Sequence, residues 1–359
     1  MTNNEINVLV VDDSSVARQL LVHLLESDSQ IHVIGVVNDG RAAIEFVSEH
    51  RPDVIVMDIN MPHLDGFEAT RRIMETQPVP IIICTSTTDP REVVTTFRLM
   101  EAGAVACLKK PVSRDHADFD QLATNLLETV KLMSEVKVVR RWPRSRHASL
   151  PAPGATEGKS APSAVPLIGI GASTGGPPVL QTILSSLPKD FPAAILIVQH
   201  IARGFLPGLV EWLNQTTGLQ VHVGSHGTYA LPGHVYLAPD DFHMGVRSGG
   251  RTLLTHEAPE NGLRPAVSYL FRSLAEVCGR NAVGVLLSGM GKDGAVELKL
   301  MRDKGAITIA QDRETSVVHG MPGEAIELGG ATHVLAADNI ADILITLVGR
   351  RHTAGGIAL

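Results

Sequence analysis

Cysteine is scarce in this 359-residue chain, which has only three: Cys84, Cys107 and Cys278. They lie far apart in apolar contexts and form no CxxC pair, which argues against a disulfide framework and against a cysteine-based metal site. Their spacing therefore predicts buried, reduced thiols, as expected for a protein of the cytoplasm.

Long hydrophobic runs and an excess of positive charge are also missing. Every apolar run is interrupted well short of the roughly 20 residues of a membrane span, and no apolar core follows Met1, so we expect neither a signal peptide nor membrane insertion. The formal net charge of -7, from 31 Lys+Arg against 38 Asp+Glu, gives no global basic field, so we expect no nucleic-acid partner.

The composition is otherwise that of a folded globular protein. Hydrophobic residues make up 44% of the chain and charged residues 19%, and 359 residues are too many for one ordinary core. Residues 135–165 break the pattern, because they are rich in Pro, Ala, Ser and Gly and carry a cluster of basic residues. We therefore predict a domain at 1–134, a flexible linker at 135–165, a second domain at 166–350 and a C-terminal tail at 351–359.

The first half alternates apolar strands with helical patterns. "INVLVVDD" and "PDVIVMD" are apolar runs that end in acids, and "PIIIC" and "AVACL" follow later in the chain. Helical patterns occupy Val16 to Leu25, Arg41 to Glu49 and Glu68 to Glu75. This alternation is typical of βαβ units around a parallel sheet, whose functional sites form at the carboxyl ends of the strands.

Charged and polar side chains follow those strands. Asp12, Asp13 and Asp58 would meet at one edge, where their mutual repulsion favours a divalent cation with oxygen ligands, here Mg²⁺. "CTS" and "LKKP" bring the Thr85 hydroxyl and the Lys110 ammonium to the same edge. A hydroxyl, a cation and Mg²⁺ around a free carboxylate suit phosphoryl transfer, which makes Asp58 the predicted phosphoacceptor.

The second half opens with "LIGIGASTGGPPVL", which has two interpretations. The segment "GASTG", Gly171 to Gly175, fits the G-x-S-x-G turn that exposes a nucleophilic serine, here Ser173. Gly169, Gly171 and Gly175 also resemble a dinucleotide fingerprint, with Asp190 near the place of a ribose-binding acid. This segment alone leaves a phosphate cradle and a nucleophile turn equally possible.

Two further apolar strands favour the nucleophile turn. "AAILIVQH" ends in His200, and "AVGVLLSGMGKDGA" carries Asp293 in the turn that follows its strand. With Ser173, these residues form a candidate triad of nucleophile, base and orienting acid at one sheet edge. Each residue also has a simpler interpretation as a helix cap or packing residue; for Asp293 this would be a cap on the helix near Gly294. The chain order Ser, His, Asp differs from that of α/β-hydrolases.

Other histidines lie in a stretch interpreted as surface β-hairpins at the rim of the cleft. His222 and His226 have the i,i+4 spacing of a helical metal pair, but their neighbours are glycine-rich and strand-like, which argues against that role. His319 follows another strand and is a weaker candidate for the site.

Residues 5 to about 130 resemble a response-regulator receiver domain, through "VVDD", "VMDIN", "MPHLDG", "CTS" and "LKKP". The resemblance implies that Asp12, Asp13, Asp58 and the Asn60 carbonyl hold Mg²⁺. It also implies that a histidine kinase phosphorylates Asp58, and that Thr85 and Lys110 are the switch residues. Cys107 stands where the family usually has Tyr or Phe, so an aromatic switch is not expected in its usual form.

Residues 166 to about 349 resemble the catalytic domain of the chemotaxis protein-glutamate methylesterases, the CheB family. The matching segments include "IGASTGG", "IVQHI", "RPAVSYLFRSLA" and "GVLLSGMGKDGA". The resemblance implies a doubly wound parallel α/β sheet and hydrolysis of glutamate γ-methyl esters on chemoreceptors, with deamidation of receptor glutamines in many members. It also implies that the Met290 backbone N–H is the oxyanion donor, with Thr174 beside the nucleophile, and that the esterase chemistry needs no cofactor.

The order receiver, linker, triad suggests a switch enzyme. In this hypothesis the unphosphorylated receiver blocks the catalytic cleft, and phosphorylation of Asp58 weakens that docking. The opposing hypothesis is non-enzymatic: the second half would be a degenerate partner-binding module or a dinucleotide-binding module. The intact triad argues against the first, and the position of Asp190 outside an apolar strand end argues against the second.

Overall fold

The computed structural model of the chain describes residues 5–86, 90–111, 118–136 and 166–354. Most of the predicted linker at 135–165 and the end of the predicted tail at 351–359 lie outside the described residues. Helix α5 (Phe119–Ser134) ends just before the predicted linker, and α11 (Ala337–Ala354) continues through the start of the predicted tail.

The amino-terminal domain is a five-stranded parallel sheet in the order β2-β1-β3-β4-β5. Its strands are β1 (Ile6–Val11), β2 (Ile31–Val37), β3 (Val54–Met57), β4 (Ile81–Thr85) and β5 (Ala106–Lys109), and its helices are α1 (Ser15–Leu25), α2 (Gly40–Glu49), α3 (Gly66–Thr76), α4 (Pro90–Ala102) and α5. This is a doubly wound, flavodoxin-like order, and the parallel α/β sheet predicted for this half is confirmed. The sequence interpretation did not place β2, which lies at the edge of the sheet.

Side-chain caps fix where three of these helices begin. Ser14, Asp39 and Asp65 stand in extended conformations and accept hydrogen bonds from the first free amides of α1, α2 and α3. Ser14 and Asp39 closely follow β1 and β2, and the start of α3 is tied to the end of β3 by the Gly66 N–H, which donates to the Ile59 carbonyl, so all three helices begin near the carboxyl edge of the sheet. That edge is where the predicted acidic side chains lie.

The carboxy-terminal domain is a seven-stranded parallel sheet in the order β14-β13-β12-β6-β7-β9-β8. The strands are β6 (Leu167–Ala172), β7 (Ala194–Gln199), β8 (Gln220–Val223), β9 (His234–Leu237), β12 (Ala282–Leu286), β13 (Ile307–Gln311) and β14 (His333–Leu335). Strands β6, β7 and β12 are buried along their whole length, which explains their continuous apolar sequences.

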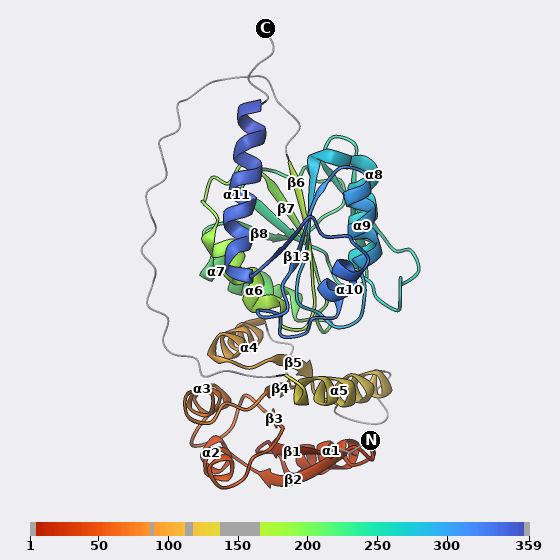
Figure 1. Ribbon diagram of the computed structural model, residues 1–359. Coiled ribbons are helices and arrows are strands. Elements are labelled where there is room, and N and C mark those ends of the chain that lie inside the picture. Colours follow the sequence, from red (N-terminus) through yellow and green to blue (C-terminus); the bar gives the residue numbers. More distant parts are fainter. Residues whose placement is uncertain (1–4, 87–89, 112–117, 137–165, 355–359) are drawn as a thin grey trace.

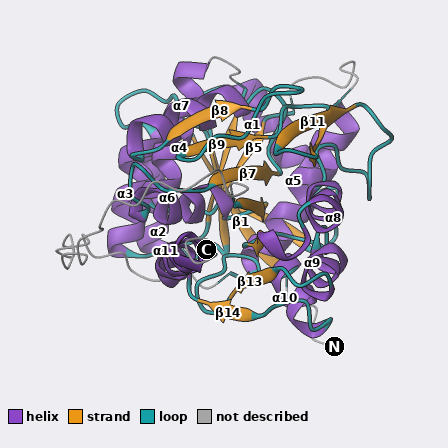
Figure 2. Ribbon diagram, turned by 90° about the horizontal axis from the view of Figure 1, so that it is seen from above, coloured by secondary structure: helices purple, strands orange, loops and turns teal. Residues whose placement is uncertain are grey.

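Helices cover both faces of this sheet, so the doubly wound fold predicted for the second half is confirmed (Figure 1). On one face lie α6 (Gly176–Ser186), α7 (Leu206–Thr216) and α11; on the other lie α8 (Val267–Val277), α9 (Ala295–Asp303) and α10 (Met321–Glu327). Figure 2 shows the same layers from above. A separate antiparallel pair, β10 (His243–Arg247) and β11 (Arg251–Thr255), packs against α8.

The hairpin-rim interpretation of the histidine-rich stretch was wrong for β9. Instead of forming a surface hairpin, this strand pairs in parallel with both β7 and β8 inside the main sheet. Val235, Tyr236 and Leu237 are buried there, so the short segment supplies part of the core. Only β10 and β11 form the expected antiparallel pair.

The two domains are packed together through one face of the first. Figure 1 shows α4 and α5 between the amino-terminal sheet and the carboxy-terminal domain. Apolar side chains of α4, including Val93, Phe97 and Met100, belong to the same buried cluster as the α6, α7 and α11 face of the second domain. The carboxyl edge of the second sheet faces this contact, and the candidate site lies there.

Candidate active site and phosphoacceptor site

Ser173 follows β6 directly, in the turn before α6. The turn is held by bonds from the Ser173 N–H to the Ser288 carbonyl at 3.0 Å and from the Gly176 N–H to the Ser173 carbonyl at 2.8 Å. Gly175 has φ +77°, the left-handed conformation that favours glycine, and α6 then starts with proline in its first turn. Ser173 therefore stands at the strand-to-helix turn predicted from "GASTG".

The positions of the other glycines weigh against a phosphate cradle. Gly169 and Gly171 lie inside β6, where an added Cβ would come within 2.3 Å of Leu274 and Val267, respectively. They are therefore packing glycines that let α8 approach the sheet. Asp190 is exposed in the connection between α6 and β7, away from any strand end.

His200 occupies the equivalent position on the neighbouring strand. Ala172 pairs with Gln199 in the parallel register of β6 and β7, so Ser173 and His200 each follow the last residue of adjacent strands. The His200 N–H donates to the Ala172 carbonyl at 2.9 Å. The Gln199 side-chain amide joins the two turns, because it donates to the Ser173 carbonyl at 2.9 Å and to the His200 carbonyl at 2.8 Å.

Asp293 brings its carboxylate to His200 from the turn after β12. Its Oδ2 lies 3.0 Å from His200 Nε2, and the two side chains are 3% and 12% exposed. Asp293 does cap a helix, but not the one near Gly294: its oxygens accept from the Val267 and Ser268 amides at the start of α8, at 2.7 and 3.0 Å. Burial raises the pKa of Asp293, but the charge contact with His200 and the hydrogen bonds from Ser268 outweigh it and lower the pKa overall.

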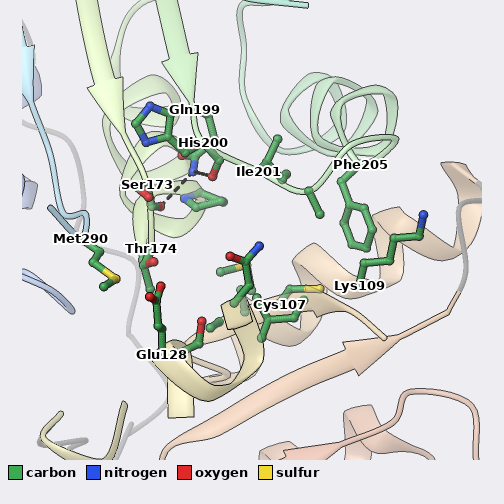
Figure 3. Close-up of a pocket in the computed structure, with 18 of the residues that line it drawn as sticks. Cys107, Lys109, Glu128, Ser173, Thr174, Gln199, His200, Ile201, Phe205 and Met290 are labelled. Atoms are coloured by element: carbon green, nitrogen blue, oxygen red, sulfur yellow. Dashed lines mark hydrogen bonds between the residues drawn. The ribbon is translucent and has the colours of Figure 1, made fainter. Parts of the chain in front are cut away.

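The three residues are assembled but not fully aligned. The His200 ring N–H does not point along its 3.0 Å contact with Asp293, so this is a charge contact more than a straight hydrogen bond. Among the described residues, no hydrogen bond joins the Ser173 hydroxyl to His200, although both side chains line one pocket (Figure 3). Loose geometry of this kind is common in catalytic groups before substrate binds.

The segment that follows β12 packs closely against the serine. A Cβ added at Gly289 would lie 2.7 Å from the Ser173 Cβ, so only glycine allows this approach. Met290, the next residue, is 45% exposed and lines the pocket together with Thr174 (Figure 3). The buried Ser288 hydroxyl donates to the Thr174 carbonyl at 2.8 Å and fixes this side of the turn.

The pocket that contains Ser173 is closed on its other side by the amino-terminal domain. It has a volume of about 520 Å³. One wall belongs to the catalytic domain and includes the Ser173 turn, His200, Ile201 and Phe205. The opposite wall consists of residues of α4, β5 and α5: Phe97, Met100, Ala106, Cys107, Leu108, Lys109, Leu122, Asn125, Glu128 and Thr129. Figure 3 shows Cys107 and Lys109 across the cavity from the serine turn.

The acidic residues of the first domain meet as predicted. Asp12, Asp13 and Asp58 offer carboxylate oxygens that all lie within 4.8 Å of one another, at the carboxyl ends of β1 and β3. All three candidate ligands are carboxylate oxygens, and together they carry two or three negative charges. Such a set of ligands fits Mg²⁺. Asn60 is exposed in the loop after β3, two residues beyond Asp58.

Lys110 balances part of this negative charge. Its Nζ lies 2.6 Å from Asp12 Oδ2 and 2.8 Å from Asp58 Oδ1, and all three side chains are nearly buried. Burial raises the pKa of Asp58, opposed by the hydrogen bond from Lys110. Thr85 is buried at the end of β4, and its carbonyl accepts from the Lys110 N–H at 2.8 Å, so the two predicted switch residues are neighbours.

Cys107 lies on β5 between the two sites. It packs against both the domain-interface cluster and the core around β3 and β4, and it also lines the Ser173 pocket. Burial raises the pKa of its thiol well above the ordinary value. The position that is usually aromatic in receivers therefore carries a small, neutral side chain that faces the other domain.

Comparisons with known proteins account for both halves. Residues 8–118 match the response regulator receiver domain and residues 168–344 match the CheB methylesterase. The chain belongs to the CheB family. A relative from Nitrosospira multiformis, named protein-glutamate methylesterase/protein-glutamine glutaminase, is 54% identical over 348 residues, which is 96% of this chain and 98% of the relative.

Other members of the CheB family agree. A relative from Syntrophus aciditrophicus with the same activity in its name is 53% identical over 96% of this chain and 99% of its own length. The crystal structure of the Thermotoga maritima CheB methylesterase catalytic domain matches with a TM-score of 0.50 and 40% identity, over 52% of this chain and all of that one. None of the described helices is long and apolar enough to cross a membrane.

Four side chains that the sequence interpretation did not select support this CheB site. Gln199 and Ser288 bond to carbonyls of the serine turn, and Ser268 bonds to the Asp293 carboxylate. Asp240 accepts from the Gly204 N–H at 2.9 Å in the loop after His200. Gln199 stands beside His200 in "IVQH", and that strand-end position was the one available signal. His319 does not line the Ser173 pocket.

Proposed function

We propose that this chain is a phosphorylation-activated esterase that hydrolyses glutamate γ-methyl esters on chemoreceptors, releasing methanol, and deamidates receptor glutamines. The supporting observation is that Ser173 and His200, at the ends of adjacent strands, line one pocket, and that Asp293, in the turn after the neighbouring strand β12, contacts His200. The names of its relatives supply the substrate class. Its biological role would be adaptation in a chemosensory pathway.

In the acylation step, the Ser173 hydroxyl attacks the ester carbonyl while His200 accepts its proton. Because His200 Nε2 faces Asp293, the nitrogen left to accept this proton is Nδ1. Asp293 holds the ring and stabilises its charged form. The backbone N–H groups of Met290 and Thr174, beside the nucleophile, would stabilise the negative oxygen of the tetrahedral intermediate.

His200 then returns the proton to the leaving group, which departs as methanol from an ester or as ammonia from a glutamine amide. Water attacks the acyl-serine in the second half of the reaction, again with His200 as base. The products are a free glutamate side chain and regenerated Ser173. No step of this esterase chemistry calls for a cofactor.

Control would come from the receiver domain. A histidine kinase donates the phosphoryl group to Asp58, and Mg²⁺, when bound by Asp12, Asp13, Asp58 and the Asn60 carbonyl, supplies charge neutralisation for that transfer. Lys110 already contacts Asp58, and Thr85 lies beside Lys110. Both can bind phosphoryl oxygens. These partners, and the three unpaired cysteines, suit a protein of the cytoplasm.

The domain contact supports an inhibited ground state. Residues of α4, β5 and α5 form one wall of the Ser173 pocket, so a receptor helix cannot reach the serine while this wall is in place. Phosphorylation of Asp58 would weaken the docking through β4 and β5, whose ends carry Thr85 and Lys110. A coupling of about 1.4 kcal/mol would change the open fraction about tenfold.

Methanol release from methylated chemoreceptors, measured with and without a small phosphodonor, tests this function. Ser173→Ala should lower the rate by about 10⁴-fold or more, as removal of a triad nucleophile does. Ser185→Ala, an exposed serine on the neighbouring helix α6, is the matched control and should leave the rate unchanged. Methanol release by a folded Ser173→Ala protein at the wild-type rate would rule out the proposed nucleophile.

A binding module is the rival function, and a fluorophosphonate probe separates the two. The triad predicts covalent labelling at Ser173 that is lost in Ser173→Ala. Stabilisation by a dinucleotide without any labelling would instead favour the cradle interpretation.

A further inference from the structure

The carboxylate of Asp293 is held by more than the triad. Its Oδ1 accepts from the Ser268 hydroxyl at 2.5 Å and from the Ser268 N–H at 3.0 Å. Its Oδ2 accepts from the Val267 N–H at 2.7 Å and lies 3.0 Å from His200. These four contacts use the whole acceptor capacity of a carboxylate, which is about four lone-pair sites.

The direction of the Ser268 hydroxyl is fixed by its other partner. The Gly294 N–H donates to Ser268 Oγ at 3.0 Å, so the oxygen acts as an acceptor there and its own hydrogen is free to point at Asp293. Ser268 is 4% exposed, so its hydroxyl is largely shielded from solvent. The result is a charge-assisted hydrogen bond, which is shorter and stronger than a neutral one.

The start of α8 is built to receive this acid. Ala266 occupies the cap position of the helix and has no side chain that could accept from its first amides. Asp293 fills that role from another segment, where the positive end of the helix dipole also favours a negative charge. Val267 is wedged against the positions of Gly171 and Gly294, which fixes the helix start beside the site.

We propose that Ser268 is a positioning residue that acts through Asp293: its hydroxyl orients the carboxylate and draws charge from Oδ1, and so sets how strongly Asp293 stabilises protonated His200. This rests on the proposed esterase function. Among the described residues, His200 is the only titratable group in contact with the carboxylate; α8 contributes the neutral donors of Val267 and Ser268.

Removal of the hydroxyl has a defined consequence. In Ser268→Ala, the Asp293 carboxylate loses the hydrogen bond from the hydroxyl. Its negative charge then interacts more strongly with His200, so the protonated ring is stabilised. The acid limb of kcat/KM against pH should therefore move upward by about half to one pH unit. Activity should fall at pH 6.5 and return to near the wild-type value at pH 9, with KM unchanged. Ser268→Thr, which keeps the hydroxyl, should restore the wild-type limb.

The matched control is Ser273→Ala, on the same helix. The Ser273 hydroxyl also makes two hydrogen bonds across the packing, to the Val246 carbonyl at 3.0 Å and from the Val246 N–H at 2.7 Å, but it is remote from the carboxylate. It should lower thermal stability and leave the pH profile in place. A Ser268→Ala profile that is uniformly lowered, unmoved or shifted downward would overturn the proposal.

A second measurement separates this proposal from the esterase function itself. The titration of the His200 ring, followed by NMR in the full chain and assigned with His200→Gln, needs no substrate. An upward shift of its midpoint in Ser268→Ala would support the role of Ser268 even if wild type released no methanol. Unchanged titration in a Ser268→Ala protein that folds would contradict it, whatever the receptors show.

Discussion

The Phe97 ring of the receiver stacks on the Trp212 ring of the catalytic domain, with centroids 5.4 Å apart and planes 23° from parallel. Phe97 is 1% exposed and Trp212 is fully buried, and both belong to one apolar cluster that joins the two domains. Beside them, Arg98 donates to the Gln215 side chain at 3.4 Å. This stack anchors α4 on α7 and thereby holds the receiver over the Ser173 pocket.

Loss of this anchor should activate the enzyme without phosphorylation. Phe97→Asp removes the ring and places a charge in an apolar contact. A buried aromatic anchor of this kind contributes about 2 kcal/mol to the docking of the two domains, which corresponds to about a thirtyfold change in the ratio of closed to open molecules. Basal methanol release should therefore rise at least tenfold and respond less to a phosphodonor. Val36→Asp, at an exposed position on the far strand β2, is the control. A folded Phe97→Asp protein with wild-type basal activity would contradict the blocking role of this face.

Cys107 should report on the same opening. Burial raises the pKa of its thiol, so little thiolate forms at neutral pH and alkylation should be slow while the domains are docked. Undocking exposes the thiol and relieves the burial that raises its pKa. Alkylation of Cys107, followed by peptide mass spectrometry, should therefore accelerate in Phe97→Asp and on phosphorylation. Cys278, half-buried behind α8, is the internal reference and should keep its rate.

The sequence predicted both sites because their chemistry follows simple geometric rules. Asp12, Asp58, Ser173 and His200 each stand directly after an apolar strand, and in a parallel sheet such positions meet at one edge. Asp293 was the more difficult case, because a turn separates it from β12. Its dual contact, with His200 and with the α8 amides, depends on a helix that begins 26 residues earlier in the chain.

The remaining features required three-dimensional information. β9 carries only four residues, too few to distinguish an interior parallel strand from a surface hairpin. Ser268 is the second residue of the amphipathic helix α8, where a serine usually has no catalytic relevance. The contact between Phe97 and Trp212 joins residues 115 positions apart across a domain boundary, and no local pattern encodes such a pairing.

Asp58→Asn should remove control while sparing the catalytic machinery. The amide cannot accept a phosphoryl group, so stimulation by a phosphodonor should disappear, and chelation of Mg²⁺ should have the same effect on wild type. Basal methanol release should stay within about twofold of wild type. Asp53→Asn alters an exposed acid just before β3, the strand that Asp58 follows, and should keep full stimulation. Stimulation that persists in Asp58→Asn would place the phosphoacceptor elsewhere.

Asp293 should also make the stability of the protein depend on pH in a predictable direction. Its pKa is lowered in the folded state: burial opposes this, but the charge contact with His200 and the hydrogen bonds from Ser268 prevail over it. The folded state therefore binds fewer protons than the unfolded chain. The stabilisation of the folded protein by the charged carboxylate is complete above the pKa of the unfolded chain, near 3.8, and is lost as the pH falls through the pKa of the folded state. Asp293→Asn should be less stable than wild type at pH 6 and should lose less stability between pH 6 and pH 3. Urea unfolding of both proteins across this range measures the difference. Parallel curves for the two proteins would mean that the carboxylate is not stabilised in its charged form by the α8 amides and His200.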